Sequence, residues 1–254
     1  LAAVGCMVDS CRTCDQCQRG EEQFCREGLF GTYGGRDRVS GDNNYGGYGK
    51  HIVGREEFVL TLPQGLDPAK AAPLLCAGIT TYSPLKTWGV KAGSRVGVVG
   101  LGGLGHMAVK LAVAMGADVT GMSRSADKEA DARELGAQHF LNTSDSAEMM
   151  AHAMGFDLII DTVPVQHDLM PYVPLLDVDG TLCLVGQLGP APDLNTAPLV
   201  LKRKRIAGSL IGGIPETQEM LDFCAERGVL PEVEMIRMDQ INDAFERMEK
   251  SDVR

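Results

Sequence analysis

A short apolar run that ends in glycines and leads into a helical pattern is the feature that most constrains the fold of this chain. The run 96–99 is followed by Gly100-Leu-Gly-Gly-Leu-Gly105, after which Met107, Leu111 and Met115 recur at helical spacing. This order of strand, tight turn and helix is the context in which Gly-x-Gly-x-x-Gly holds the pyrophosphate of a dinucleotide at a helix N-terminus.

The glycines have separate physical roles in such a turn. Gly100 permits the tight turn, Gly102 lets the backbone approach a pyrophosphate, and Gly105 lets the helix pack close to the strand. The predicted cofactor-binding residues of the turn are Gly100, Leu101, Gly102, Gly103, Leu104 and Gly105. The alternative is a flexible glycine turn without a ligand, which the flanking strand and helix disfavour.

The end of the next predicted strand, 117–122, indicates which dinucleotide is bound. NAD sites usually place Asp or Glu here, about 20 residues beyond the first glycine, to bind the ribose 2′-hydroxyl. This chain instead has Ser123, Arg124 and Ser125, with Lys128 one turn further. A carboxylate would repel a 2′-phosphate, whereas two hydroxyls and two cations would bind one. The sequence therefore favours NADP over NAD, the alternative being a solvated turn that carries basic residues by chance.

The remainder of the middle of the chain alternates apolar strands with helical patterns. Further strands are expected at 136–142, 156–161, 180–186 and 205–211, and helices at 127–135 and 147–154. Such alternation predicts an α/β fold with a doubly wound parallel sheet of the Rossmann type, covered by helices on both faces.

Five of the eight cysteines lie in the first 25 residues. Cys11, Cys14, Cys17 and Cys25 have the spacing C-x2-C-x2-C-x7-C, which allows four thiolates to surround one Zn²⁺ ion. Four protein ligands leave no open position, so the predicted zinc site is structural. Two disulfides, a redox Cys-x-x-Cys pair and an iron–sulfur cluster are the alternatives, and each lacks the compartment or sequence context that it requires.

Composition excludes several classes of function. The formal net charge of −10 argues against a nucleic-acid binder or a protein of anionic membrane surfaces, and aromatic residues make up only 5%. No apolar run approaches the ~18 residues that span a bilayer. The first residues do not resemble a secretory signal, and a cytoplasmic location is expected. The chain starts as if within a strand and stops in an amphipathic pattern at 239–254, so we expect a fragment cut at both ends.

The zinc tetrad followed by this nucleotide-binding unit resembles the medium-chain, zinc-dependent alcohol dehydrogenases. It is most similar to their cinnamyl-alcohol-dehydrogenase-like branch, which includes NADPH-dependent aldehyde reductases. The resemblance covers essentially the whole chain. The segments that carry it, besides the cysteines and the glycine turn, are Gly46-Gly47-Tyr48, 73–80, Asp161-Thr162 and 184–186.

The resemblance implies roles for individual residues. Cys76 matches the last ligand of a catalytic zinc, and Thr80 matches a residue at the nicotinamide end of the cofactor. The group Ser123, Arg124, Ser125 and Lys128 matches a 2′-phosphate pocket. Further cofactor contacts are implied for Thr162, Gly186, Ser209, Leu210 and Ile211. Leu210, Ile211 and Phe30 are implied as walls of the substrate pocket, although the loop around Phe30 departs from the family pattern.

The implied protein is an oxidoreductase that interconverts primary alcohols and aldehydes with NADP(H) and zinc. Its expected organisation is a partial GroES-like, mostly β catalytic domain at 1–75, a Rossmann domain at 76–213, and a return to the catalytic domain at 214–254. The other catalytic zinc ligands and a hydroxyl–imidazole relay are expected N-terminal to the zinc lobe, so His51 and His106 are interpreted as ordinary histidines.

The resemblance also implies a homodimer formed edge to edge through the last Rossmann strand, near 206–211. Two other classes of function remain as alternatives. One is a non-catalytic NADPH-binding sensor or structural protein, which the presence of Cys76 argues against. The other is a zinc-ribbon interaction module fused to a nucleotide-binding domain.

Overall fold

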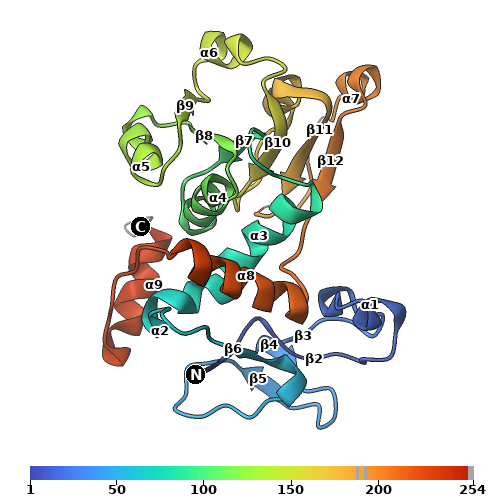
Figure 1. Cartoon of the computed structure of the whole chain (residues 1–254), viewed down its shortest axis with the longest axis vertical. Coiled ribbons are helices and arrows are strands. Elements are labelled where there is room, and N and C mark those ends of the chain that lie inside the picture. The colour runs from blue at the N-terminus through green and yellow to red at the C-terminus, as the bar shows by residue number, and fades with distance from the viewer. Residues whose placement is uncertain (187–188, 192–193, 251–254) are drawn as a thin grey trace.

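A six-stranded sheet forms one end of the computed structural model, which describes residues 1–186, 189–191 and 194–250 (Figure 1). Its strands are β7 (Arg95–Val99), β8 (Asp118–Ser123), β9 (His139–Asn142), β10 (Phe156–Asp161), β11 (Leu176–Leu184) and β12 (Arg205–Gly208). Every neighbouring pair is parallel. This architecture confirms the predicted α/β fold with a Rossmann-type parallel sheet.

The direction in which successive strands are added to the sheet reverses between β7 and β10. The order is β12-β11-β10-β7-β8-β9, so the chain runs outward from β7 in one direction and then outward from β10 in the other. The loops that leave the carboxyl ends of β7 and β10 therefore diverge to opposite faces. The crevice between such loops is where open α/β sheets bind their ligands.

Side chains of the central strands alternate between two cores. Val96 and Val98 are fully buried in one core, while Val99 and Ile159 belong to the other. The first core is closed by α3 (Ala77–Thr87), α4 (Gly103–Ala114), α5 (Glu129–Glu134) and α8 (Ile214–Arg227); η5 (Met170–Leu175), α6 (Ser146–Ala151) and α7 (Ala197–Lys202) cover the other face. The alternation follows from the two-residue period of a strand, and it buries apolar side chains on both faces of the central strands β7 and β10.

The other end of the molecule, referred to here as the N-terminal lobe (residues 1–75), contains short antiparallel strand pairs. The pairs are β1 (Ala2–Val4) with β6 (Val59–Thr61), β2 (Met7–Asp9) with β3 (Phe30–Gly31), and β4 (Tyr33–Arg36) with β5 (Asn43–Tyr45). Short helices complete it: α1 (Asp15–Gln18), η1 (Glu22–Phe24), η2 (Glu56–Phe58), α2 (Pro68–Ala71) and η3 (Ala72–Leu75).

Helices α3 and α8 join the N-terminal lobe to the sheet. Phe58 and Leu60 of the lobe lie in the same buried cluster as Ile79 of α3 and Met220 of α8. The side-chain amide of Gln218 on α8 both accepts from the N–H and donates to the carbonyl of Thr61, each at 2.9 Å. These bonds extend the edge of β6 with a side chain in place of a further strand.

Element boundaries differ from the sequence expectation at several strands. The expected strand 205–211 ends at Gly208, and Ile211, which the expectation included, has φ +34°, a conformation incompatible with a strand. The strands expected at 136–142 and 180–186 span 139–142 and 176–184. The expected C-terminal helix is realised as η6 (Met238–Gln240) and α9 (Ile241–Glu249), and its last expected residues, 251–254, lie outside the described residues.

The packing of the glycine turn predicts opposite outcomes for two Gly→Ala changes. A Cβ at Gly105 would lie 1.9 Å from the carbonyl oxygen of Gly100, whereas a Cβ at Gly103 would meet nothing within 4 Å. We expect Gly105→Ala to lower the free energy of unfolding by about 1–3 kcal/mol. Gly103→Ala should leave it unchanged or raise it by up to about 1 kcal/mol. Denaturant unfolding of both variants checks this, and equal effects would contradict the packing described.

Candidate functional site

The turn after β7 leaves main-chain groups open at the crevice between β7 and β10. Gly100 has φ +83°, which glycine adopts without strain, and its N–H donates to the carbonyl of Met122 at 3.0 Å. Helix α4 starts directly afterwards at Gly103, and a Cβ at Gly102 or Gly103 would meet nothing within 4 Å. The exposed first turn of a helix offers unpaired N–H groups and a positive dipole end, which suit a pyrophosphate.

The loops after β10 and β11 close tightly against this turn. The buried hydroxyl of Thr162 lies 2.8 Å from the carbonyl oxygen of Val99 and 3.1 Å from that of Gly100. A Cβ at Gly186 would lie 2.5 Å from the carbonyl group of Thr162. The structure thus brings Thr162 and Gly186 beside the glycine turn, with the Thr162 hydroxyl holding the turn in place. Their contact with a cofactor stays a prediction.

The turn after β8 collects the four residues predicted to bind a 2′-phosphate. Ser123 is half-buried, and its hydroxyl accepts from the N–H of Ser125 at 3.2 Å. Arg124 is exposed, and its carbonyl accepts from the Ser144 hydroxyl at 3.0 Å, which fixes the main chain there. Lys128 is exposed as well but pairs with Asp131 at 2.8 Å. Ser123 and Arg124 are therefore the better-placed partners for a phosphate.

Cys76 lies at the N-terminus of α3 and is the one exposed cysteine of the eight, all of which are described. A hydrogen bond with Cys6 lowers the pKa of the Cys76 thiol to about 6, against the opposing effect of burial. Such a thiol is largely ionised near neutral pH, which is the form that binds zinc. Thr80, one turn along α3, is buried.

The segment after β12 lies near Leu75, the residue before Cys76. Ser209 donates its N–H to the carbonyl of Leu184 at 3.1 Å, and Leu210 is exposed. Ile211 is buried and lines one cavity with Leu75, the residue before Cys76. The positive φ of Ile211 is strained for a β-branched residue, and such strain persists only where the surroundings enforce it.

The N-terminal lobe braces this strained segment. A Cβ at Gly213 would lie 1.7 Å from the carbonyl oxygen of Gly20, so the two backbones are in direct contact. The carboxylate of Glu22 accepts from the N–H of Ile214 at 2.9 Å, at the start of α8, where the helix dipole favours a negative charge. Gly20 and Glu22 both belong to the loop between Cys17 and Cys25.

The four cysteines Cys11, Cys14, Cys17 and Cys25 form a compact cluster. Their sulfur atoms all lie within 4.8 Å of one another. Cys14 and Cys17 are 3.5 Å apart and Cys11 and Cys17 are 3.9 Å apart, as measured between sulfurs. A tetrahedral zinc with ~2.3 Å bonds requires sulfur separations of ~3.8 Å. All eight cysteines are free, so the disulfide alternative is not realised.

Main-chain N–H groups of the cluster point at its sulfurs. Cys14 donates its N–H to the sulfur of Cys11, and Cys11 donates its N–H to the sulfur of Cys25, both at 3.3 Å. The N–H groups of Thr13 and then Cys14 lower the pKa of the Cys11 thiol to about 6. The donor set therefore fits a metal that prefers thiolate ligands.

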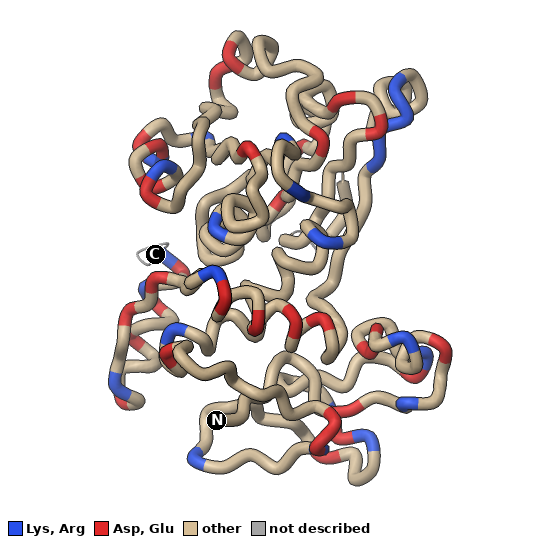
Figure 2. Tube along the Cα trace, viewed as in Figure 1, with Lys and Arg blue, Asp and Glu red and all other residues tan. Residues whose placement is uncertain are grey.

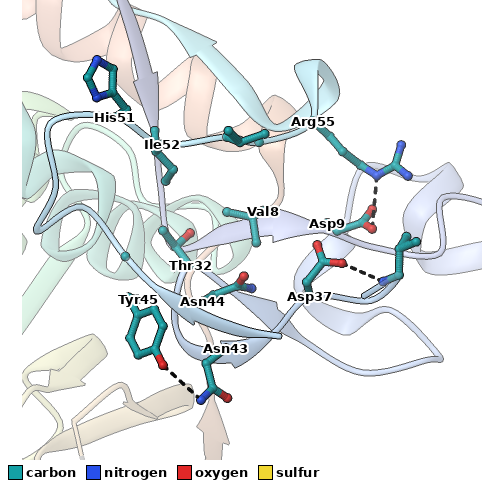
Figure 3. A pocket seen from close by; sticks show the side chains of 14 residues that line it. Val8, Asp9, Thr32, Asp37, Asn43, Asn44, Tyr45, His51, Ile52 and Arg55 are labelled. Atoms are coloured by element: carbon teal, nitrogen blue, oxygen red, sulfur yellow. Dashed lines mark hydrogen bonds and ion pairs between the residues drawn. The ribbon is translucent and has the colours of Figure 1, made fainter. Parts of the chain in front are cut away.

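A separate cavity of about 410 Å³ lies in the N-terminal lobe and contains none of the predicted cofactor or metal residues (Figure 3). At its edge, the buried carboxylate of Asp9 pairs with Arg38 at 3.1 Å, Arg55 at 3.2 Å and Arg12 at 3.8 Å. His51 lines the cavity and is exposed. The Asp9 ion pairs tie the start of the cysteine segment to two loops, which is a structural role.

Sequence reasoning overlooked a buried acid–base pair beside the glycine turn. Asp161, the last residue of β10, pairs with His167 at 2.8 Å. The sequence does contain a signal for this pair, because an acidic residue ends a buried strand and a histidine follows six residues later. His106 was interpreted as structural, and it is buried at the start of α4 with its Nε2 accepting from the N–H of Glu232 at 3.3 Å.

This fold and site define a dinucleotide-binding oxidoreductase with a cysteine-rich metal lobe, and comparison with known proteins identifies its family. The profile of the family described as zinc-binding dehydrogenase matches residues 103–226. An NADP-dependent alcohol dehydrogenase C of Mycolicibacterium smegmatis is 52% identical over 99% of this chain and 72% of its own length. An aldehyde reductase of Escherichia coli is 49% identical over 100% and 73%.

A solved cinnamyl alcohol dehydrogenase of Sorghum bicolor superposes with a TM-score of 0.96, at 43% identity, over 100% of this chain and 72% of that one. This chain belongs to the zinc-binding dehydrogenases. The predicted family, the Rossmann fold and the class of zinc-binding oxidoreductase are confirmed, and the non-catalytic alternative is not supported. NADP is the cofactor named for the Mycolicibacterium relative.

Two further observations bear on the excluded classes. Lysine and arginine are spread over both ends of the molecule and lie among acidic residues rather than on one basic face (Figure 2). Among the helices in the described part of the chain, none has the length and hydropathy that a bilayer span requires.

The cysteine cluster predicts a specific loss on removal of one ligand. Cys14→Ser should reduce the zinc bound by the complete protein by about one ion per chain and lower its stability by about 2 kcal/mol or more. Cys224→Ala, which changes a buried cysteine outside the cluster, is the matched control and should keep full zinc content. Elemental analysis with thermal unfolding measures both effects, and unchanged zinc in Cys14→Ser would contradict the assignment.

Proposed function

We propose that the complete protein interconverts primary alcohols and aldehydes with NADP(H), at the crevice between the glycine turn and the segment 209–211. The observation that carries this proposal is the convergence of three elements at that crevice. The glycine turn before α4 is bonded to Met122, beside the turn that bears Arg124. At the other end, Ile211 lines a cavity with Leu75, the residue before Cys76. The relatives named as NADP-dependent alcohol dehydrogenase and aldehyde reductase support the same reaction.

The residues of the chain divide the work of cofactor binding. The N–H groups at the start of α4 hold the pyrophosphate, and Gly102 and Gly103 leave room for it. Gly100, Gly105 and Gly186 let the turn and its neighbouring loops pack together. Ser123 and Arg124 bind the 2′-phosphate, while Ser125 and Lys128 complete the turn around it. Thr162 fixes the turn, and Thr80, Ser209, Leu210 and Ile211 shape the nicotinamide end. A carboxylate is absent at positions 123–125, so no side chain there repels the phosphate.

We infer that Cys76 supplies one ligand to a catalytic zinc and that the four-cysteine cluster holds a structural one. When both groups are bound, zinc polarises the carbonyl oxygen of the substrate and NADPH supplies the hydride. Cys76 contributes a thiolate at neutral pH, which holds the ion at the start of α3. Leu210 is exposed and presents an apolar wall to the substrate. Phe30, on β3, is proposed as a second wall.

We also propose the organisation expected from the sequence: catalytic-domain residues 1–75 and 214–254 flank the Rossmann domain at 76–213. A homodimer through β12 is supported by the position of that strand at one edge of the sheet. Val200 and Leu201 on the adjacent α7 are 77% and 78% exposed, an apolar surface typical of an interface. A cytoplasmic location is proposed as well, since none of the eight cysteines forms a disulfide. Sedimentation of the complete protein tests the dimer.

The reaction is tested by mixing the zinc-loaded complete protein with NADPH and a panel of primary aldehydes. The decay of nicotinamide absorbance and the appearance of the alcohol should both require zinc and aldehyde. A protein that binds NADPH but consumes it with no aldehyde of the panel would contradict the proposal.

Cofactor choice gives a quantitative prediction. A charge-assisted hydrogen bond to a phosphate is worth about 1.5–3 kcal/mol, so Arg124→Ala should weaken NADPH binding about ten- to a hundredfold. NADH binding should hardly change. Ser123→Asp should go further, because it repels the phosphate and offers an acceptor to the 2′-hydroxyl of NADH. Titration of NADPH and NADH into each variant measures these affinities. An equal loss of affinity for both cofactors, or a wild-type preference for NADH, would contradict the prediction.

A matched control is available on the same turn. Lys128→Ala removes a cation that is already paired with Asp131. Its effect on NADPH affinity should therefore be smaller than that of Arg124→Ala. If Lys128→Ala weakened NADPH binding more than Arg124→Ala, the 2′-phosphate would be bound by the helical turn at Lys128 and not by the loop at Arg124.

A further inference from the structure

The buried pair of Asp161 and His167 carries one more proton than a neutral imidazole and an ionised carboxylate would carry together. The Nδ1 atom of His167 lies 2.8 Å from the carbonyl oxygen of Val165, and a carbonyl only accepts, so Nδ1 carries a proton. The Nε2 atom lies 2.8 Å from Oδ2 of Asp161. A neutral imidazole protonated at Nδ1 and an ionised carboxylate would place two acceptors face to face. One extra proton must lie between them.

The location of the pair explains why this proton is retained. Asp161 is fully buried, and the His167 side chain is 18% exposed. Burial raises the pKa of the Asp161 carboxyl. An isolated carboxylate at this depth is costly, whereas a carboxylate and an imidazole that share one additional proton carry no net charge. Cys183 on β11 and Tyr172 on η5 are the other titratable groups that face the carboxyl.

The pair closes the loop that follows β10. Oδ1 of Asp161 accepts from the N–H of Val163 at 3.0 Å, while the His167 ring is bonded to Oδ2 and to the carbonyl of Val165. A single carboxyl group thus ties both ends of the segment 162–167. At the start of this segment, the Thr162 hydroxyl is bonded to the carbonyls of the glycine turn.

The same pair is connected through Tyr172 and Thr143 to the turn predicted to bind the 2′-phosphate. The ring of Tyr172 meets the His167 ring edge-on, with centroids 6.2 Å apart. The Tyr172 hydroxyl is hydrogen-bonded to Thr143, and the charge of Arg124 acts on it. Thr143 in turn donates its N–H to the carbonyl of Ser123 at 2.9 Å. Segment 162–167 therefore faces the adenosine end of the crevice, where Val165 presents a 60% exposed apolar side chain.

We propose that the Asp161–His167 pair holds one shared proton, is uncharged as a unit, and positions segment 162–167 as a wall for the adenosine half of NADP(H). His167 is a positioning residue: it touches no reacting atom and acts through the loop. An uncharged pair also keeps a carboxylate at the end of β10 from repelling the phosphates of the cofactor. The inference rests on the proposed function for the identity of its ligand.

The test compares three variants of the complete protein by direct NADPH titration and by steady-state kinetics. His167→Phe keeps the ring but removes both hydrogen bonds. His167→Gln keeps a donor to Asp161 at the Nε2 position. His152→Phe is the matched control, because His152 also bonds a main-chain carbonyl through Nδ1, at 3.0 Å, but lies beside α6.

We expect His167→Phe to raise the NADPH dissociation constant and KM at least tenfold, with kcat at saturating cofactor and the KM for aldehyde within twofold of wild type. His167→Gln should recover affinity to within threefold, and His152→Phe should not change it. Unchanged NADPH affinity in His167→Phe, or a loss in kcat in place of affinity, would overturn the inference. Failure of the wild-type protein to bind NADPH would instead refute the proposed function.

Asp161→Asn tests the shared proton. It also keeps the inference testable if the His167→Phe variant does not fold. The asparagine amide donates to Nε2 of a neutral His167, and its oxygen still accepts from Val163, so both contacts persist without the extra proton. NADPH affinity within threefold of wild type is expected. A tenfold loss of NADPH affinity would show that the pair needs a charged carboxylate or its additional proton. That result would overturn the proposal that an uncharged Asp161–His167 pair positions the segment.

Discussion

Close backbone approach around the glycine turn is the constraint on which the rest of the site depends. The carbonyl of Gly100 occupies the position that a Cβ of Gly105 would need, and a Cβ of Gly186 would lie only 2.5 Å from the carbonyl group of Thr162. These contacts bring the loops after β7, β10 and β11 to one point, with the start of α4 facing the crevice. Any side chain at Gly105 or Gly186 would separate them, so the absence of atoms at these positions creates the binding surface.

The cysteine cluster acts on the same crevice from a distance. Its loop contacts the backbone at Gly213 through Gly20 and caps α8 through Glu22. The residue held between this contact and β12 is Ile211, which is strained. A metal held by the four cysteines would therefore restrain the segment at Ile211 and Gly213 through these contacts. In the proposed function, this is how an ion with no open coordination position would influence the nicotinamide end of the crevice.

Features defined by spacing could be predicted from the sequence, because spacing alone brings the groups together. The four cysteines and the strand–glycine–helix unit are examples, and β10 has the predicted boundaries. Features that depend on loop conformation could not be predicted. The Asp161–His167 contact requires a particular turn at 162–167, and Ile211, inside the expected strand 205–211, has a positive φ that β-branched residues rarely adopt. The ion pair that occupies Lys128 likewise appears only once the helix after β8 is formed.

The central claim is that a dinucleotide with a 2′-phosphate lies across the crevice between β7 and β10. The most direct measurement is a crystal structure of the complete protein with NADPH. Density for the pyrophosphate against the first turn of α4, with the 2′-phosphate beside Ser123 and Arg124, is the predicted result. A cofactor bound elsewhere, or one whose 2′-phosphate points away from the turn after β8, would contradict the account.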